Sequence, residues 1–308
     1  MCIRDSLRCV DEATGSLLWS KQIKTTGSYW TGCSPALWND NVIAGGTGVH
    51  SYNADDGTLN WHVYTSSSFD HQGMVIVNDT IYFRSTSSSY VSLDASDGSQ
   101  NWMIGWTIQP LMPTAYGEVN GVGYCVAPYS YSEQCVTAAS GSAVWTQSCG
   151  GNAYGNVIII GEYAYFGNTT IYKKHLQTGT NAATYNLGTW QPLGMTTNGE
   201  DMVFFLRNTS TYTYKLICLD TNLNFNWETN VGYSNEHPTV VGDYVWITEG
   251  ASISPQYLTA YSMSDGSKAY TDSTALNTYN PIWGGIVNVN NRLYVTNNNG
   301  NLFCFESQ

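Results

Sequence analysis

Charged side chains are scarce in this sequence. They make up 11 % of its 308 residues, whereas about 25 % is usual in soluble domains. Glu, Lys and Arg, which normally cover helix surfaces, are therefore few, and this argues against a helix-rich fold. Long apolar runs are also missing: runs such as Val157 to Ile160 are far shorter than the roughly 18 residues of a membrane span.

Positive charge is especially rare. Eleven basic residues against 23 acidic ones give a net charge of −12, which would repel a phosphate backbone. We therefore expect no nucleic-acid partner and no transmembrane segment. Intrinsic disorder is also excluded, because an apolar content of 42 % is enough to form a core.

Motifs of metal and cofactor chemistry are lacking as well. The eight cysteines include no Cys-x-x-Cys and no adjacent pair, and the five histidines share no metal-ligand spacing. No P-loop, dinucleotide fingerprint, nucleophile elbow or zinc-protease motif occurs. The sequence thus predicts no catalytic residue, no metal site and no bound cofactor.

Aromatic residues, in contrast, are abundant. They reach 14 % of the chain, with 30 glycines beside them, and Tyr, Trp, Val and Thr suit strands. The first six residues, Met1 to Ser6, resemble the translation of a sequencing adapter and are set aside as an artefact. If so, the native N-terminus is missing. Residues 7–308 are then expected to form a single domain.

The chain repeats one short pattern. A small residue, an apolar residue and an Asp-like residue are followed four positions later by Gly, and four positions after that by an aromatic residue. The glycines are Gly15, Gly57, Gly98, Gly141, Gly179 and Gly266, and the aromatic residues of the intact copies are Trp19, Trp61, Trp102, Trp145 and Tyr270. Two copies are degraded: one has Ala183 in place of Trp, and the other reaches Trp227 without a Gly.

Successive copies lie about 42 residues apart, which is the period of a β-propeller with four strands per blade. A hairpin precedes each pattern: apolar runs flank turn residues such as Asn39-Asp40, Asn78-Asp79 and Asn120-Gly121. The pattern itself then supplies the third strand, its Gly the turn, and its Trp the fourth strand.

These residues resemble the PQQ-binding-like propeller repeat of quinoprotein alcohol dehydrogenases and of BamB-like lipoproteins, whose consensus is close to Ala-Leu-Asp-Ala-x-Thr-Gly-x-x-x-Trp. The resemblance implies that each repeat Trp locks its blade against the next one. That role falls on Trp19, Trp61, Trp102, Trp145 and Trp227, with Tyr270 as a substitute. Ala183 breaks the pattern, which predicts that the fifth blade interface is the weakest.

Eight third-strand copies predict eight blades, in a propeller truncated at its N-terminus. Eight blades need roughly 336 residues, more than the chain has. Seven blades, closed by the strand of Trp19 on the C-terminal strands, are the alternative.

The same resemblance bears on cofactor and cysteine chemistry. Quinoprotein dehydrogenases carry adjacent cysteines over PQQ and a set of calcium ligands, and neither can be matched here. Cys9, Cys135, Cys218 and Cys304 take the small position of the repeat, as buried apolar residues would. A disulfide between Cys125 and Cys135 across a hairpin is left open.

A second set of aromatic residues lies in the connections between blades, which gather around one mouth of the central channel in a propeller. It comprises Trp30, Phe69, Trp106, Trp190, Tyr233 and Tyr279. Rigid aromatic side chains of this kind suit a peptide or a sugar ligand. The alternative is that these rings wedge between the blades and only seal the core.

We therefore expect a non-catalytic binding or scaffolding propeller that engages a protein segment or carbohydrate, in an extracytoplasmic setting. One alternative is a divergent quinoprotein-type dehydrogenase with PQQ and calcium. Another is a module of a larger cell-surface protein. The oligomeric state is left open.

The channel-mouth hypothesis can be tested by substitution. Trp30→Ala, Trp106→Ala and Trp190→Ala are expected to abolish peptide or glycan binding, because each removes a rigid contact surface, and to leave the melting temperature nearly unchanged. Binding assays and thermal melts check this. A large fall in melting temperature would instead identify the rings as core.

Overall fold

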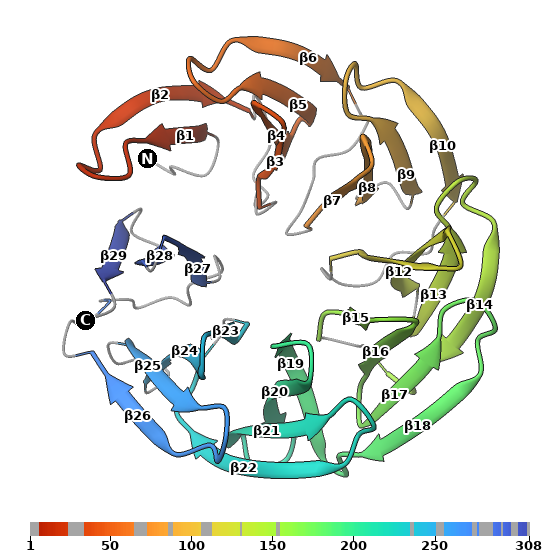
Figure 1. Ribbon diagram of the computed structural model, residues 1–308, viewed down its shortest axis with the longest axis vertical. Helices are drawn as coiled ribbons and strands as arrows, with labels where there is room; N and C mark the ends of the chain where they lie inside the picture. Colours follow the sequence, from red (N-terminus) through yellow and green to blue (C-terminus); the bar gives the residue numbers. More distant parts are fainter. Residues whose placement is uncertain are drawn as a thin grey trace. The chain divides into compact units, whose positions relative to one another are not determined.

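The computed structural model describes residues 6–23, 34–64, 73–85, 89–105, 113–129, 131–151, 155–234, 237–250, 256–272, 276, 286–290, 292–296 and 301–306. Within these residues all regular structure is β-strand (Figure 1), so the all-β prediction is confirmed. No described helix is long and apolar enough to cross a membrane.

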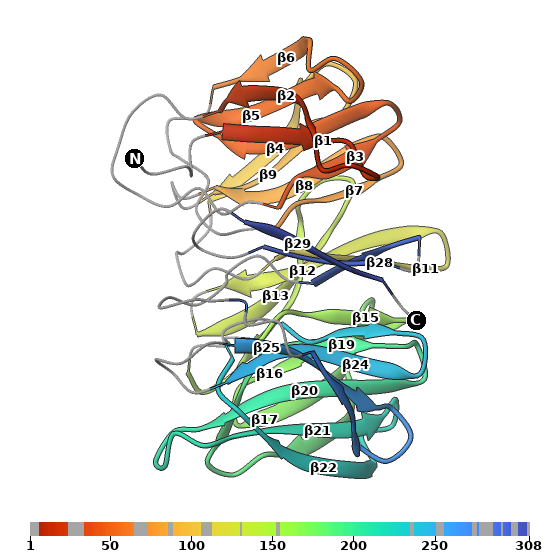
Figure 2. The ribbon, with the colours of Figure 1, turned by 90° about the vertical axis from the view of Figure 1, so that its left-hand side faces the viewer.

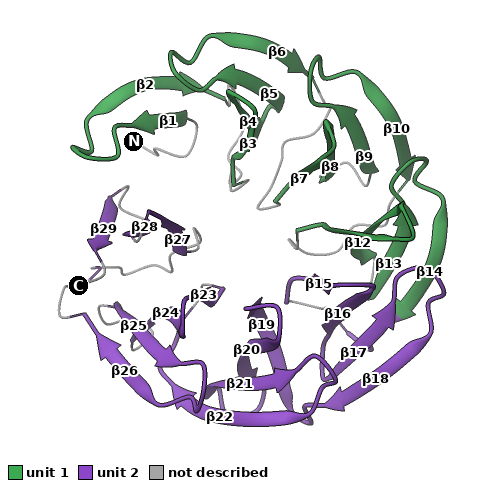
Figure 3. Cartoon of the chain, in the orientation of Figure 1, with its two compact units in different colours: residues 1–147 green, residues 148–308 purple. Residues whose placement is uncertain are grey.

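The chain divides into two compact units, Met1–Gln147 and Ser148–Gln308 (Figure 3). Unit 1 holds a two-stranded sheet and three four-stranded sheets. Their strands are β1 (Ser6–Val10) and β2 (Leu17–Gln22); β3 (Ala36–Trp38), β4 (Asn41–Gly46), β5 (Gly48–Asn53) and β6 (Leu59–Val63); β7 (Val75–Val77), β8 (Thr80–Ser85), β9 (Ser89–Asp94) and β10 (Gln100–Gly105); β11 (Ala115–Val119), β12 (Val122–Tyr129), β13 (Ser132–Thr137) and β14 (Ala143–Ser148).

Unit 2 holds three four-stranded sheets and a three-stranded sheet. Their strands are β15 (Ile158–Ile160), β16 (Tyr163–Gly167), β17 (Thr170–His175) and β18 (Asn181–Asn186); β19 (Trp190–Thr197), β20 (Asp201–Asn208), β21 (Tyr214–Asp220) and β22 (Phe225–Val231); β23 (Thr239–Val241), β24 (Tyr244–Gly250), β25 (Gln256–Ser262) and β26 (Lys268–Thr271); β27 (Ile286–Val289), β28 (Arg292–Thr296) and β29 (Leu302–Glu306).

Each sheet is an antiparallel meander whose strands follow one another in chain order, as Figure 2 shows for β19 to β22. Within each unit the first strands of successive sheets contact each other: β3 with β7 and β7 with β11, then β15 with β19, β19 with β23 and β23 with β27. This arrangement is that of a β-propeller with four-stranded blades.

The number of blades differs from our main expectation. Six complete sheets and the three-stranded sheet β27–β29 make seven blades, so eight blades are not supported and the seven-bladed alternative is. The reason lies at the start of the chain. Strands β1 and β2 correspond only to the third and fourth strands of a repeat, and they pair with each other in a sheet of their own.

The predicted hairpin turns are confirmed. Strand β3 pairs with β4 around Asn39-Asp40, β7 with β8 around Asn78-Asp79, and β11 with β12 around Asn120-Gly121. Asn39, Asn78 and Asn120 have φ values of 49°, 47° and 52°. Asn tolerates this left-handed region better than most residues, which explains its place in these turns.

Tryptophans on the fourth strands join neighbouring blades. The indole N–H groups of Trp19, Trp61 and Trp102 donate to the carbonyl oxygens of Ala54, Ala95 and Ala138 in the next sheet, at 2.8, 3.0 and 2.8 Å. In unit 2, Trp227 donates likewise to Met263 O at 2.8 Å. Each bond satisfies a polar group at the edge of a packed interface.

The third strand makes room for each of these rings. Across the ladder, Cys9 faces Trp19, Ser51 faces Trp61 and Cys218 faces Trp227. A small side chain is needed there because the indole lies against the sheet. This pairing accounts for Cys in the small position of the repeat.

The other two expected locking residues also lie on fourth strands. Trp145 lies on β14, at the end of unit 1. Tyr270 on β26 is 50 % exposed, and its hydroxyl donates to Asp272 on its own side of the sheet, at 2.7 Å. Tyr270 therefore makes none of the interblade bonds described for the tryptophans.

At the interface between the β15–β18 and β19–β22 blades, where the repeats predict the weak fifth interface, the sizes of the two facing residues are reversed. Ala183 stands where a Trp is expected, and the residue that faces it across the ladder is Lys173 instead of a small residue. Lys173 Nζ donates to Asn222 Oδ1 of the next blade at 3.1 Å. The hydroxyl of Tyr165 on β16 donates to Thr221 O at 2.8 Å, which supplies a bond of the kind the indoles make elsewhere.

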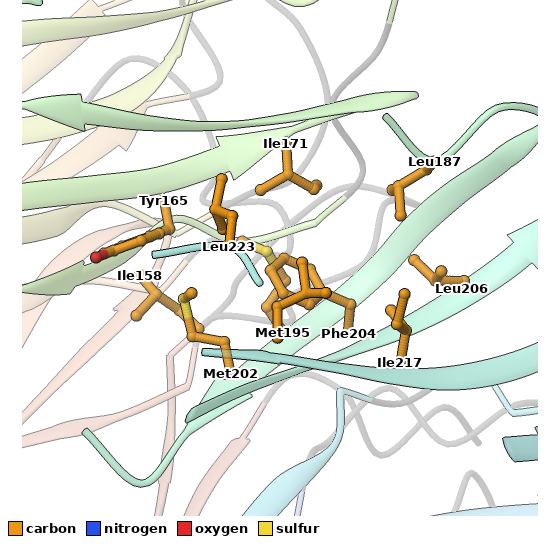
Figure 4. Close-up of a cluster of buried hydrophobic side chains, with 11 residues drawn as sticks. Ile158, Tyr165, Ile171, Leu187, Met195, Met202, Phe204, Leu206, Ile217 and Leu223 are labelled. Atoms are coloured by element: carbon orange, nitrogen blue, oxygen red, sulfur yellow. The ribbon is translucent and has the colours of Figure 1, made fainter. Parts of the chain in front are cut away.

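A cluster of buried apolar side chains reinforces this interface (Figure 4). Tyr165 and Ile171 come from β15–β18, and Met195, Phe204 and Ile217 come from β19–β22. These contacts argue against the weak interface that Ala183 predicts. A different set of side chains fills the space of the missing indole.

The cysteine pair that the sequence left open is not a disulfide. Cys125 faces Val136, and Cys135 faces Val126, across the β12–β13 ladder. Neighbouring positions along a strand point to opposite faces of the sheet, so the two thiols lie on different sides. Both are buried thiols outside any disulfide.

The close contact between the repeat Gly and the indole can be tested with Gly98→Ala. A Cβ at Gly98 would lie 2.7 Å from the Trp61 ring, at a φ of +76°. We expect a loss of about 2–4 kcal/mol in the free energy of unfolding, from strain and displacement of the ring, measured by urea denaturation.

Gly121→Ala is the matched control, because Gly121 has the same φ of +76° and nothing within 4 Å of the added Cβ. It should cost only about 1 kcal/mol, from the backbone conformation alone. Equal losses in the two variants would contradict a specific role for the indole contact.

Candidate functional site

A groove lies at one end of the β19–β22 blade in unit 2. Its volume is about 890 Å³, and its lining residues are Trp190, Tyr212, Thr213, Tyr214, Asn230, Val231, Tyr233 and Gly250. In an antiparallel meander the starts of the first and third strands and the ends of the second and fourth meet at one end of the sheet. This topology brings Trp190, Tyr214 and Val231 together.

The turn between β20 and β21 holds Tyr212 in an unusual conformation. Asn208 Oδ1 accepts hydrogen bonds from the N–H groups of Ser210 and Thr211 at 2.9 and 3.1 Å, and Tyr212 N–H donates to Asn208 O at 3.0 Å. Tyr212 has a φ of 55° and is 68 % exposed. Glycine would take this conformation without strain, so the bulky ring is retained at a cost to stability.

Three further aromatic rings form a row beside this turn. Phe205 is buried and stacks on Tyr214, with ring centroids 5.7 Å apart. Tyr233 meets Tyr214 edge to face at 5.3 Å and 84°. Burial raises the pKa of Tyr214, the neighbouring Tyr233 adds to this and Arg207 opposes it, so the Tyr214 hydroxyl remains a hydrogen-bond donor at neutral pH.

The connection that carries Tyr233 is fixed at both sides. Tyr233 exchanges backbone hydrogen bonds with Gly250 at 2.8 and 3.0 Å, and the preceding Gly232 N–H donates to Glu249 Oε2 at 2.6 Å. Burial acts to raise the pKa of Glu249, but hydrogen bonds from Lys268, Gly232 and Tyr261 outweigh it and lower the pKa. The ionised carboxylate therefore holds this connection in place.

Trp190 lies at the other side of the groove. Lys215 Nζ sits 4.5 Å from the centroid of its ring and is neutralised by Glu228 Oε2 at 2.6 Å. Trp190 also packs against the buried cluster of Figure 4. Trp190 therefore lines the groove and also packs on the core, so Trp190→Ala would disturb packing as well as the groove.

The structure brings together two of the six predicted site residues, Trp190 and Tyr233. The other four, Trp30, Phe69, Trp106 and Tyr279, lie outside the described residues. Sequence reasoning missed Tyr212 and Tyr214. Their Tyr-x-Tyr spacing in the turn between the second and third strands was a usable signal, since that turn lies at the same end of a blade as the connection to the next one.

The described residues supply no match for the calcium site of quinoprotein dehydrogenases. Among the described residues no group of three or more His, Cys, Asp or Glu side chains could hold a metal ion. The sequence contains no adjacent cysteines. We therefore derive no chemical step through that cofactor.

The fold and the groove define a β-propeller with an aromatic groove at one end of a blade. A family model described as outer membrane protein assembly factor BamB matches residues 9–185. The chain belongs to this family, which confirms the resemblance seen in its repeats.

Solved structures support the fold. BamB from Moraxella catarrhalis is similar, with a TM-score of 0.71 and 14 % identity over 99 % of this chain and 95 % of that one. The computationally designed Ika8 protein has a TM-score of 0.73 and 9 % identity, over 99 % of this chain and 91 % of that one. No curated protein matches the chain by sequence.

A buried carboxyl group in unit 1 has a displaced pKa. Glu133 on β13 is 0 % exposed, and its carboxylate oxygens have no hydrogen-bond partner among the described residues. Burial raises the pKa of Glu133 to about 8, although the positive charge of Arg84 opposes this. An ionised carboxylate without hydrogen bonds is costly to bury, so we assign Glu133 a cost to stability at high pH.

Glu133→Gln tests this assignment. The folded-state pKa lies above the unfolded value, so the contribution of Glu133 is fully present below about pH 4.5 and is lost as the pH rises towards 8. Relative to Glu133→Gln, the wild type should lose ~2–4 kcal/mol of unfolding free energy between about pH 5 and pH 9. Urea denaturation across this range measures it.

The exposed Glu200→Gln, which removes a carboxyl group from the surface, is the control for the substitution itself. A constant difference between wild type and Glu133→Gln would contradict the raised pKa.

Proposed function

We propose that this protein is a non-catalytic propeller scaffold that binds an extended segment of a partner protein in the aromatic groove of the β19–β22 blade. The observation that carries the proposal is Tyr212. A strained backbone with an exposed aromatic ring is a feature that packing does not require, and such strain concentrates at functional sites.

The family supports a protein partner. The matching family model is named for an assembly factor, and assembly factors act by contact with other proteins. The same membership supports an extracytoplasmic location, in agreement with the low charge of the chain. Rigid aromatic side chains bury much area at little cost in conformational entropy, which suits the capture of a flexible segment.

Tyr212→Gly separates binding from stability. Peptides enriched from a random dodecamer display library on the whole protein should bind Tyr212→Gly at least about tenfold more weakly by calorimetry, a loss of about 1.4 kcal/mol. The melting temperature should stay equal or rise, because glycine relieves the strain at φ 55°. Tyr131→Ala is the matched control, since Tyr131 is a 54 % exposed tyrosine in the corresponding turn of another blade.

Three outcomes would overturn the proposal. Enriched peptides could bind Tyr212→Gly as tightly as the wild type. A glycan array could yield Tyr212-dependent ligands where the peptide library yields none. Addition of PQQ and Ca²⁺ could produce dye-linked alcohol oxidation.

A further inference from the structure

The chemistry of the groove narrows the kind of segment that fits it. Aside from the aromatic rings, its polar groups are neutral: the phenol hydroxyls of three tyrosines, the amide of Asn230 and the hydroxyl of Thr213. No carboxylate and no cation line it. Lys215, whose ammonium group lies over the Trp190 ring, is already paired with Glu228.

Two backbone carbonyls of this lining are already used. The Gly250 carbonyl accepts the N–H of Tyr233 at 2.8 Å. The carbonyl of Thr213 accepts the N–H of Asn208 at 2.9 Å, and its hydroxyl is shared with Thr211 at 2.8 Å. What the groove offers to a ligand is the neutral O–H and N–H donors of the tyrosine hydroxyls and of the exposed Asn230 amide, together with the acceptor oxygens of the same groups.

Strand addition does not suit this place. The groove lies at the ends of strands, where β20 pairs with β21 up to Arg207 and Tyr214, and β21 with β22 up to Tyr214 and Val231. An added strand needs a free ladder edge. A ligand here must gain its affinity from side-chain packing on the rings instead.

An ordinary extended peptide brings one backbone N–H per residue to this surface, and each N–H that is buried without an acceptor is unfavourable. Proline has no N–H and leaves only carbonyl acceptors to be satisfied, which the O–H and N–H donors of the groove can do. Proline-rich segments also form a preformed polyproline II helix with little entropy to lose, and aromatic-lined grooves are a recurrent way of binding them.

Building on the proposed function, we propose that the groove of Trp190, Tyr212, Tyr214, Asn230 and Tyr233 binds a proline-rich segment in the polyproline II conformation, flanked by basic residues. The flanks follow from charge. The chain carries a net charge of −12, which attracts Lys and Arg near the groove and repels acidic segments.

Fluorescence anisotropy with three labelled dodecapeptides tests the proposal on the whole chain. The first is proline-rich with lysine flanks, the second has alanine in place of each proline, and the third has glutamate in place of each lysine. The first should bind at least about tenfold more tightly than either of the others.

The preference must also depend on the groove. Tyr212→Gly and Asn230→Ala should each weaken binding of the proline peptide, because they remove a ring and an exposed donor. Both residues are exposed, so folding is preserved. Tyr131→Ala should bind as the wild type does.

The outcomes separate this inference from the proposed function. If the alanine peptide binds as tightly as the proline peptide and both depend on Tyr212, the proline inference is wrong and the scaffold proposal stands. The same holds if display peptides without proline bind and the proline peptide does not. If no peptide shows dependence on Tyr212, both proposals are wrong.

Discussion

The architecture depends on one contact, in which an indole on the fourth strand of a blade meets the turn of the next blade. The ring needs three partners at once: a small residue facing it across the ladder, a glycine below it, and a carbonyl to accept its N–H. Trp61 has all three, in Ser51, Gly98 and Ala95. Because these requirements fall at fixed offsets along the chain, they generate the repeat by which the fold is recognised.

The interface between the β15–β18 and β19–β22 blades shows that filled volume and satisfied hydrogen bonds are required there, and not a Trp as such. Lys173 replaces the small residue and Ala183 replaces the Trp, so the large and small side chains change places. The Tyr165 hydroxyl makes the bond to a carbonyl oxygen that an indole makes elsewhere. Leu223 adopts a φ of 64° at the position where other turns have glycine. The space is filled and the polar groups are satisfied by other means. Buried cores accept such changes when volume and hydrogen bonding are maintained together.

Most of the fold could be predicted from the sequence, because the repeat period and the strand register are set by residues close together along the chain. Hairpin turns such as Asn78-Asp79 and the spacing of Trp61 and Gly98 could be read directly. The effect of Ala183 on its interface could not be predicted, because the residue that faces it, Lys173, is identified only once the strand pairing and its bulge are known. At the site, Trp190 and Tyr233 followed from topology, whereas the conformation of Tyr212 is set by hydrogen bonds of a turn that carries no periodic signal.

The span of the interblade bonds bears on how the chain folds as it is made. Each indole bond joins residues only 34 to 36 positions apart, so a blade can be secured once the following third strand has left the ribosome. Contacts of such short range favour rapid, stepwise folding. During synthesis, only the first and the most recent blades would then each expose an unsealed apolar face, so the surface open to aggregation would not grow with the number of blades.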